Sequence, residues 1–309
     1  MRFNRGMQAS PTKASPGRFD AHGAGRFPAR HASRFAGRLA GGAATLLDWL
    51  LPTICVVCER PLPPGLPAPA EPPRGWCTGC AATLPGLAAP RCPRCGERSR
   101  PGQACAACRM HPPDLDLAFV LADYARPLDH LVQAIKFGRQ SMFAAPLGRL
   151  LARTVASRWQ GPPPDFVVTV PLAPARLAGR GFNQALLLAG PVAAAFGQRP
   201  ARGQLVRLRE SAPASSLGAA ERRQALAQAF AARSLRPGAC VLVVDDVMTT
   251  GATLFAAARA LKAAGAARVA ACVAARTLPP GFDPGDTSAC GIPSTDTAAP
   301  DPAPSATSC

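Results

Sequence analysis

Residues 241–254, VLVVDDVMTTGATL, place two adjacent carboxylates at the end of an unbroken apolar run. A continuous Val-rich run of this length is typical of a strand that is buried on both faces of a parallel sheet. Asp245 and Asp246 then stand at the carboxyl end of the strand, which is the edge where such sheets bind ligands. The helical pattern of residues 253–266 follows, so this stretch predicts a strand, a loop and a helix in succession.

The other segments with a regular apolar pattern favour the same class of fold. Strands are predicted at 115–125, 165–172, 239–247 and 267–275, and helices at 127–139, 145–159, 182–196 and 253–266. This alternation predicts an α/β domain over residues 115–277, with a parallel sheet covered by helices on both faces. Pro191 predicts a kink or a break in its helix. Residues 197–224 are polar and rich in arginine, and their apolar residues show little regular spacing.

The loop after the acid pair has the composition of a phosphate-binding site. It contains Thr249, Thr250, Gly251, Ala252 and Thr253. Small residues allow the backbone to wrap around an anion, and the helix that follows turns free N–H groups and its positive end toward the loop. No GKS or GKT sequence occurs, which excludes a nucleotide-triphosphate loop. Because the neighbouring carboxylates need donors of their own, a ribose 5-phosphate with Mg²⁺ fits the pattern best.

Eight of the twelve cysteines form four CxxC pairs. They are Cys55/Cys58, Cys77/Cys80, Cys92/Cys95 and Cys105/Cys108. In a chain without a secretion signal this spacing indicates metal binding, and four pairs suffice for two structural tetrahedral Zn²⁺ sites. We expect the first pair to join the second and the third to join the fourth, while a cross-braced pairing stays open. The module is predicted over 44–112, beginning with a short helix at 44–52.

Three stretches resemble a known family. VLVVDDVMTTGAT resembles the phosphoribosyl-pyrophosphate (PRPP) motif of the type I phosphoribosyltransferases. TVPLAPARLAGRGFNQ (169–184), the AIKFGR segment with Lys136 and LLDWLLPTICVVC resemble the ComF family, the competence-associated branch of that group. The likeness runs from about residue 44 to residue 276, and it covers neither terminal segment.

The resemblance implies a fold, a ligand and a set of site residues. The fold is a type I phosphoribosyltransferase-like domain after a double zinc ribbon. The ligand is PRPP with Mg²⁺, bound by Asp245, Asp246, Thr249, Thr250, Gly251, Ala252 and Thr253. The catalytic candidates are Arg176, Arg180 and Lys136. The resemblance places the two arginines in a loop facing the pyrophosphate, where guanidinium groups would neutralise a leaving group. Lys136 is either a ligand contact or a helix-terminal cation.

The sequence also departs from its relatives. Thr249 stands where purine-salvage phosphoribosyltransferases place an acid that can act as a general base. Ala214 and Ala225 replace the Gln and Asn expected in the flexible lid. Turnover is therefore an open question at this point, and two functions compete. One is phosphoribosyl transfer to an unidentified acceptor, and the other is non-catalytic binding of single-stranded DNA or a competence helicase.

Charge and composition bear on the partners and the location. The net charge of +17 favours polyanions. Five arginines of the zinc module, Arg91, Arg94, Arg98, Arg100 and Arg109, would suit phosphates, although the module can equally be a staple packed on the main domain. Residues 1–40 are predicted to be a disordered basic arm and residues 278–309 a disordered tail. No window reaches about 18 apolar residues, so a cytoplasmic protein without a membrane span is expected.

Overall fold

The computed structural model describes residues 53–63, 71–138, 140–208 and 229–279. The predicted basic arm at 1–40, the predicted helix at 44–52 and almost all of the predicted tail lie outside these residues. The same holds for Ala214 and Ala225 of the expected lid. Within the described part of the chain, no helix combines the length and the apolar character needed to cross a membrane.

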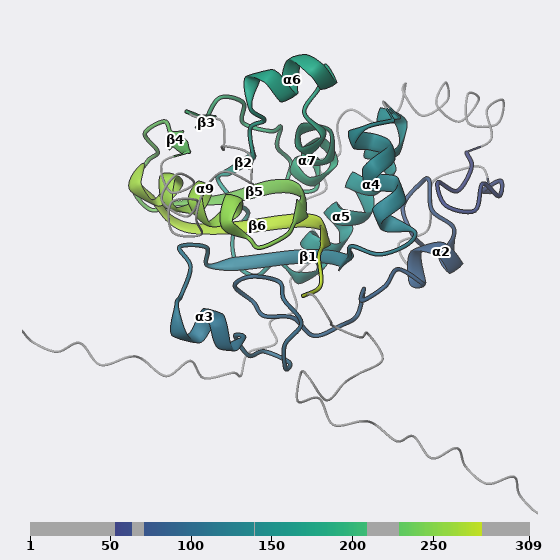
Figure 1. The fold of residues 1–309 in the computed structure, drawn as a ribbon, viewed down its shortest axis with the longest axis horizontal. Coiled ribbons are helices and arrows are strands. Elements are labelled where there is room, and N and C mark those ends of the chain that lie inside the picture. The colour runs from purple at the N-terminus through teal and green to yellow at the C-terminus, as the bar shows by residue number, and fades with distance from the viewer. Residues whose placement is uncertain (1–52, 64–70, 139, 209–228, 280–309) are drawn as a thin grey trace, which may run out of the picture. The chain divides into compact units, whose positions relative to one another are not determined.

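Four parallel strands form the central sheet, in the order β1–β6–β5–β2 (Figure 1). They are β1 (Leu117–Asp123), β2 (Phe166–Thr169), β5 (Ala239–Met248) and β6 (Ala266–Arg276). The acid-bearing strand β5 lies inside the sheet, with Val244 opposite Cys272 of β6 and Thr169 of β2 on its other side. The predicted parallel sheet is confirmed.

Helices cover both faces of this sheet. They are α4 (Leu128–Lys136), α5 (Ala144–Arg158), α7 (Gln184–Ala194) and α9 (Ala252–Ala263). The helix α6 (Pro174–Arg180) and the 3-10 turn η1 (Ser141–Phe143) belong to the same domain and bury none of their residues. Leu242 and Val244 of β5 pack in one core with α4, α5 and α7. Val241 and Val243 point the other way and pack in a second core with α9. Every residue of this strand segment is thus buried by one layer or the other, which explains its unbroken apolar run.

Of the two outcomes predicted for Pro191, a kink or a break, the structure contradicts the break. The helix α7 runs through this proline as one element to Ala194, so it is not broken there. The proline lies in the last turn, and its carbonyl still accepts a hydrogen bond from the N–H of Ala195 at 3.1 Å. Tight packing also holds α7 in place, because a Cβ at Gly148 of α5 would lie 3.1 Å from Cγ of Pro191.

Several short elements were not predicted, among them α6, β3 and β4. The helix α6 occupies residues that were expected to form a loop, and it buries none of its seven side chains. The strands β3 (Leu205–Arg207) and β4 (Phe230–Ala232) form a separate antiparallel pair. A helix without a buried face has no amphipathic pattern, and a three-residue strand is too short to show alternation.

The cysteine module shares the two cores of the main domain. Trp76 of the first half is 2% exposed and donates from Nε1 to the carbonyl of Pro146 at 3.0 Å. It packs in the core that contains α4 and α5. In the second half, Cys92, Cys95 and Cys108 belong to the α9 core on the opposite face. The module, which also contains α2 (Thr78–Ala82) and α3 (Ala106–Met110), is therefore built into the domain.

Candidate functional site

The acid pair lies at the carboxyl end of β5, with one carboxylate oxygen unsatisfied. Asp246 is 5% exposed, and its Oδ1 lies 3.1 Å from Nζ of Lys136 and accepts from the N–H of Val247 at 2.6 Å. Its Oδ2 is buried and has no hydrogen-bond partner among the residues that the structure describes. A buried acceptor without a donor costs about 1–3 kcal/mol. This oxygen is therefore suited to accept a hydrogen bond from a hydroxyl group or to bind a cation.

Asp245 lies beside it in a surrounding that disfavours its charge. Burial, which is the largest cause, and the negative charge of Asp246 together raise the pKa of Asp245 to about 8. The N–H of Asp246 donates to Oδ1 of Asp245 at 2.9 Å, and the positive charges of Lys136 and Arg207 also lower this pKa. Asp245 consequently holds its proton near neutral pH, and an added cation would favour loss of that proton.

The loop after β5 is tightly turned. It comprises Thr249 and Thr250, which are exposed, and Gly251, which is buried and precedes α9. Gly251 has a φ of +85°, and a Cβ there would lie 2.6 Å from Cε of Met248. Only glycine fits both constraints. Oγ1 of Thr250 accepts from the N–H of Ala252 at 3.4 Å, while Thr253 lies in the first turn of α9.

The RGFNQ stretch ends α6, caps the start of α7 and ties that start to the end of β2. Gly181 ends α6 with a φ of +81°, and Oδ1 of Asn183 caps α7 by accepting from the N–H of Ala185 at 3.0 Å. Nδ2 of Asn183 donates to the carbonyl of Val170 at 3.0 Å, which fixes the end of β2. The loop that was expected to hold Arg176 and Arg180 is in fact the helix α6.

The candidate cations come from two adjoining elements. Lys136 lies in the last turn of α4, as expected for a helix-terminal cation, and it pairs with Asp246 of the acid pair. Its contact with a ligand stays a prediction. The next residue, Phe137, is 75% exposed, and the guanidinium of Arg180 lies 5.4 Å from its ring centroid. Nη1 of Arg180 donates to Oε1 of the buried Gln184 at 2.6 Å. Arg176 is exposed on the same helix as Arg180.

One further cation was not singled out from the sequence. Arg207 ends β3, and its guanidinium lies 5.3 Å from the ring centroid of Phe230 on β4. Its charge lowers the pKa of Asp245, so it contributes to the field at the acid pair. In sequence, the available signal was its place in the pair Arg207 and Arg209, which opens the segment RLRESAPASSL (207–217).

Two groups of four cysteines have the geometry of zinc centres. Cys55, Cys58, Cys77 and Cys80 form the first centre, and Cys92, Cys95, Cys105 and Cys108 form the second. In each group the four sulfur atoms lie within 4.8 Å of one another. A tetrahedron with Zn–S bonds of about 2.3 Å needs sulfur separations of about 3.8 Å, and the Cys58–Cys77 pair shows 3.8 Å. The donor sets fit structural Zn²⁺, and the predicted pairing is confirmed.

Two arginines of the zinc module are already engaged. Arg91 lies 2.6 Å from Oδ1 of Asp123, and Arg98 pairs with the other oxygen of the same carboxylate. Asp123 is 1% exposed at the carboxyl end of β1. The expectation that these two side chains suit phosphates is therefore not supported, because their charges are used to fasten the second zinc centre to the sheet.

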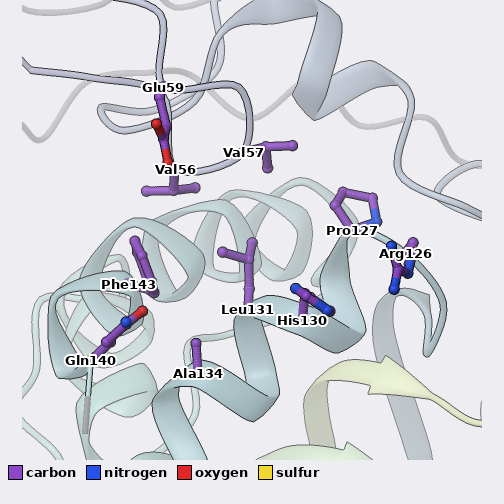
Figure 2. Close-up of a pocket in the computed structure, with 10 residues that line it drawn as sticks. All are labelled: Val56, Val57, Glu59, Arg126, Pro127, His130, Leu131, Ala134, Gln140 and Phe143. Carbon is purple, nitrogen blue, oxygen red and sulfur yellow. The ribbon is translucent and has the colours of Figure 1, made fainter. Parts of the chain in front are cut away.

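A separate hollow lies beside the first zinc centre. Its cavity volume is about 340 Å³, and Val56 and Val57 face His130, Leu131 and Phe143 across it (Figure 2). None of its lining residues belongs to the acid pair or to the loop after β5. The hollow is therefore distinct from the candidate site at the end of β5.

Two protein-family models match the chain. The double zinc ribbon domain matches residues 46–109, and the phosphoribosyl transferase domain matches residues 183–284. The second match includes the acid pair, the loop after β5 and Arg276 at the end of β6.

Curated relatives match most of the chain. The DNA utilization protein YhgH of Salmonella typhi is 36% identical over 232 residues, which cover 74% of this chain and 99% of that protein. The protein of the same name from Escherichia coli strain K12 is 35% identical over 233 residues, with the same coverage. Competence protein F of Haemophilus influenzae is 32% identical over 187 residues, or 58% of this chain and 81% of that protein.

Proposed function

The chain belongs to the ComF family, and we propose on that premise that it binds PRPP with Mg²⁺ at the carboxyl end of β5. The observation that carries the proposal is the buried Oδ2 of Asp246, which lacks a hydrogen-bond partner within the described residues while Lys136 holds Oδ1. A vicinal diol or a hydrated Mg²⁺ supplies what this oxygen needs. Binding of this ligand, unlike its transfer to an acceptor, requires neither a general acid nor a general base.

Each part of the ligand has a matching group. The 5-phosphate binds the loop Thr249–Gly251 and the first turn of α9, where Ala252 and Thr253 lie. The ribose hydroxyls bind Asp245 and Asp246. Arg176 and Arg180 face the pyrophosphate. Bound Mg²⁺ supplies positive charge that stabilises pyrophosphate as it departs. With Thr249 in place of an acid, the loop offers no general base, so the acceptor in any transfer must arrive as a competent nucleophile.

The role of this binding lies in DNA uptake. The relatives named DNA utilization protein and Competence protein F support this assignment, as do the matched double zinc ribbon and phosphoribosyl transferase domains. The protein then acts in the cytoplasm, where PRPP is made and where imported single strands arrive. PRPP is either a donor in transfer to an unidentified acceptor or a signal of the metabolic state.

A thermal-shift panel tests the ligand class. PRPP with Mg²⁺ should raise the melting temperature, because a ligand that binds only the folded state stabilises that state. Ribose 5-phosphate should raise it less, and ATP should leave it unchanged. An equal response to all three phosphates would indicate a general anion site and contradict the proposal. A parallel ³¹P spectrum shows whether free pyrophosphate appears, which distinguishes transfer from binding.

Replacing Arg180 by alanine should weaken PRPP binding about 10- to 100-fold, because a charge-assisted contact to pyrophosphate is worth about 1.5–3 kcal/mol. The free energy of unfolding should fall by about 1–3 kcal/mol, because Arg180 donates to the buried Gln184, and the variant should stay folded at about 25 °C, since α6 buries no side chain of its own. The dissociation constant is measured by calorimetry. Arg259→Ala is the matched control, because Arg259 is 61% exposed and pairs with Asp114. An equal loss in both variants would show a general charge effect.

A second function, binding of single-stranded DNA, is favoured by the net charge of +17. The exposed Arg100 and Arg109 of the zinc module remain on its surface, and a competence helicase is a further partner consistent with DNA uptake. Binding of an oligonucleotide should weaken more than tenfold between about 50 and 200 mM salt. It should survive the Asp245→Asn/Asp246→Asn double substitution. Failure to bind at about 50 mM salt, measured by fluorescence anisotropy, would exclude this function.

A further inference from the structure

A buried arginine joins the phosphate loop to the second zinc centre. Arg276 is the last residue of β6 and is 6% exposed. It lies opposite Met248 in the register of the sheet. Its Nη1 donates to the carbonyl of Thr249, and also to the carbonyls of Thr277 at 2.7 Å and Met248 at 3.4 Å. One guanidinium nitrogen therefore holds the point where the strand passes into the loop.

The other side of the same guanidinium binds the zinc knuckle. Nε donates to the carbonyl of Cys95 at 3.2 Å, and Nη2 lies 2.7 Å from Oε2 of Glu97. The backbone of Glu97 in turn accepts from the N–H of Cys92 at 2.7 Å. Cys92 and Cys95 belong to the second group of four cysteines, so a zinc ion bound there would fix the carbonyl of Cys95 and the backbone of Glu97, whose side chain holds Arg276.

The hydrogen bond to Thr249 also sets the direction of a donor. In a trans peptide the carbonyl and the following N–H point in opposite directions. With the carbonyl of Thr249 turned inward to Arg276, the N–H of Thr250 points away from Arg276. The same holds one residue earlier, where the carbonyl of Met248 accepts from Arg276 and from the N–H of Thr277 at 3.1 Å. The N–H groups of Thr249 and Thr250 therefore both point away from Arg276, and successive N–H groups turned to one side are an arrangement that binds anions.

The knuckle that holds Arg276 is itself fixed to the sheet. Arg91 and Arg98 pair with Asp123 at the end of β1. Gly96 has a φ of +67°, and a Cβ on it would clash with Cγ2 of Val120. Among the residues that the structure describes, no contact joins the first zinc centre to the phosphate loop, and its anchor Trp76 contacts Pro146 of α5 and packs in the core on the other face.

We propose that Arg276 is a positioning residue through which the second zinc centre orients the phosphate loop. PRPP affinity then depends on the second zinc centre and not on the first. This proposal rests on the proposed function for its ligand, but the order of the loop can be measured without any ligand.

Two matched pairs of variants test the proposal. Arg276→Gln removes the guanidinium group that joins the loop to the zinc centre. Arg158→Gln is its control, because Arg158 also donates to backbone carbonyls, those of Val120 and Leu87, which lie away from the loop. Cys105→Ser and Cys77→Ser remove one ligand from the second and the first centre, respectively, and both cysteines are half-buried. Glu97→Gln is a milder variant in case Arg276→Gln does not fold.

Two quantities are measured, the calorimetric dissociation constant for PRPP with Mg²⁺ and the backbone ¹⁵N order parameter of Thr250 in the ligand-free protein. We expect Arg276→Gln and Cys105→Ser to raise the dissociation constant at least tenfold. The order parameter should fall from about 0.85 to below about 0.6. Glu97→Gln should raise the dissociation constant severalfold, while Arg158→Gln and Cys77→Ser should leave both quantities close to those of the parent protein.

Three results would overturn the proposal. The first is an equal effect of Cys105→Ser and Cys77→Ser on the order parameter, and the second is an unchanged order parameter in Arg276→Gln. The third is full recovery of both quantities in Arg276→Lys, because lysine keeps the charge without the fork. If the parent protein does not bind PRPP at all, the proposed function fails, and the order parameter still decides whether Arg276 positions the loop.

Discussion

Asp245→Asn should make the ligand-free protein more stable at pH 8 and abolish measurable PRPP binding. Burial and the charge of Asp246 raise the pKa of Asp245 to about 8, so ionising this carboxyl opposes folding. Asparagine keeps the shape and removes the ionisation. The gain in the free energy of unfolding at pH 8 should be on the order of 2 kcal/mol. A ligand site that is destabilising when empty is the expected signature of binding machinery.

The ionisation of Asp245 should make the free energy of unfolding fall as the pH rises. The pKa of Asp245 in the folded protein lies above its ordinary value of 3.8. Its contribution to stability is therefore fully present below about pH 4 and is lost as the pH rises toward 8. Urea unfolding of the parent protein and of Asp245→Asn at pH 5 and pH 8 measures this slope. The difference between the two proteins should be larger at pH 8.

Asp114→Asn is the control for this experiment. Asp114 pairs with Arg259 at 2.8 Å, and both side chains are exposed, so its loss should change stability by less than about 1 kcal/mol at either pH. If Asp245→Asn were no more stable than the parent protein at pH 8, the burial argument for the acid pair would be wrong.

Loss of the second zinc centre should destabilise the protein more than loss of the first. Three of its four cysteines, Cys92, Cys95 and Cys108, lie in the α9 core. Cys92 is 0% exposed, and the hydrogen bond from Cys95 lowers its pKa to about 4, which favours the thiolate that zinc needs. Cys92→Ser should lower the free energy of unfolding by about 3–5 kcal/mol.

Zinc content and urea unfolding measure this effect together. The parent protein should contain two zinc ions per chain, and Cys92→Ser and Cys58→Ser should each contain one. Cys58 is exposed, so Cys58→Ser should cost less stability than Cys92→Ser. Equal losses of stability would show that the two centres support the domain alike, contrary to their different places in the two cores.

The main elements of the sheet could be predicted because their signals are local. The apolar run that ends at Asp245 is buried by a helical layer on each face, and α4 shows a regular apolar face with Leu128, Leu131 and Ile135 buried. The pairing of the cysteines could also be predicted, since short connections bring neighbouring pairs together.

The remaining features depend on contacts between distant parts of the chain. Arg276 follows Met248 by 28 residues and Glu97 by 179 residues, so no local pattern links them. Arg91 and Arg98 resembled a phosphate-binding surface in sequence because their partner Asp123 follows only after the module ends. A buried carboxylate that turns arginines inward has no compositional signal.

Calorimetric titration of PRPP with Mg²⁺ into the zinc-replete protein tests the central claim most directly. The Asp245→Asn/Asp246→Asn double variant is titrated beside it, and zinc content and urea unfolding confirm that both proteins are folded. We predict saturable binding of one PRPP per chain by the parent protein and none by the variant. Equal binding by both proteins, or no binding by the parent protein, would contradict a ribose-phosphate site at the end of β5.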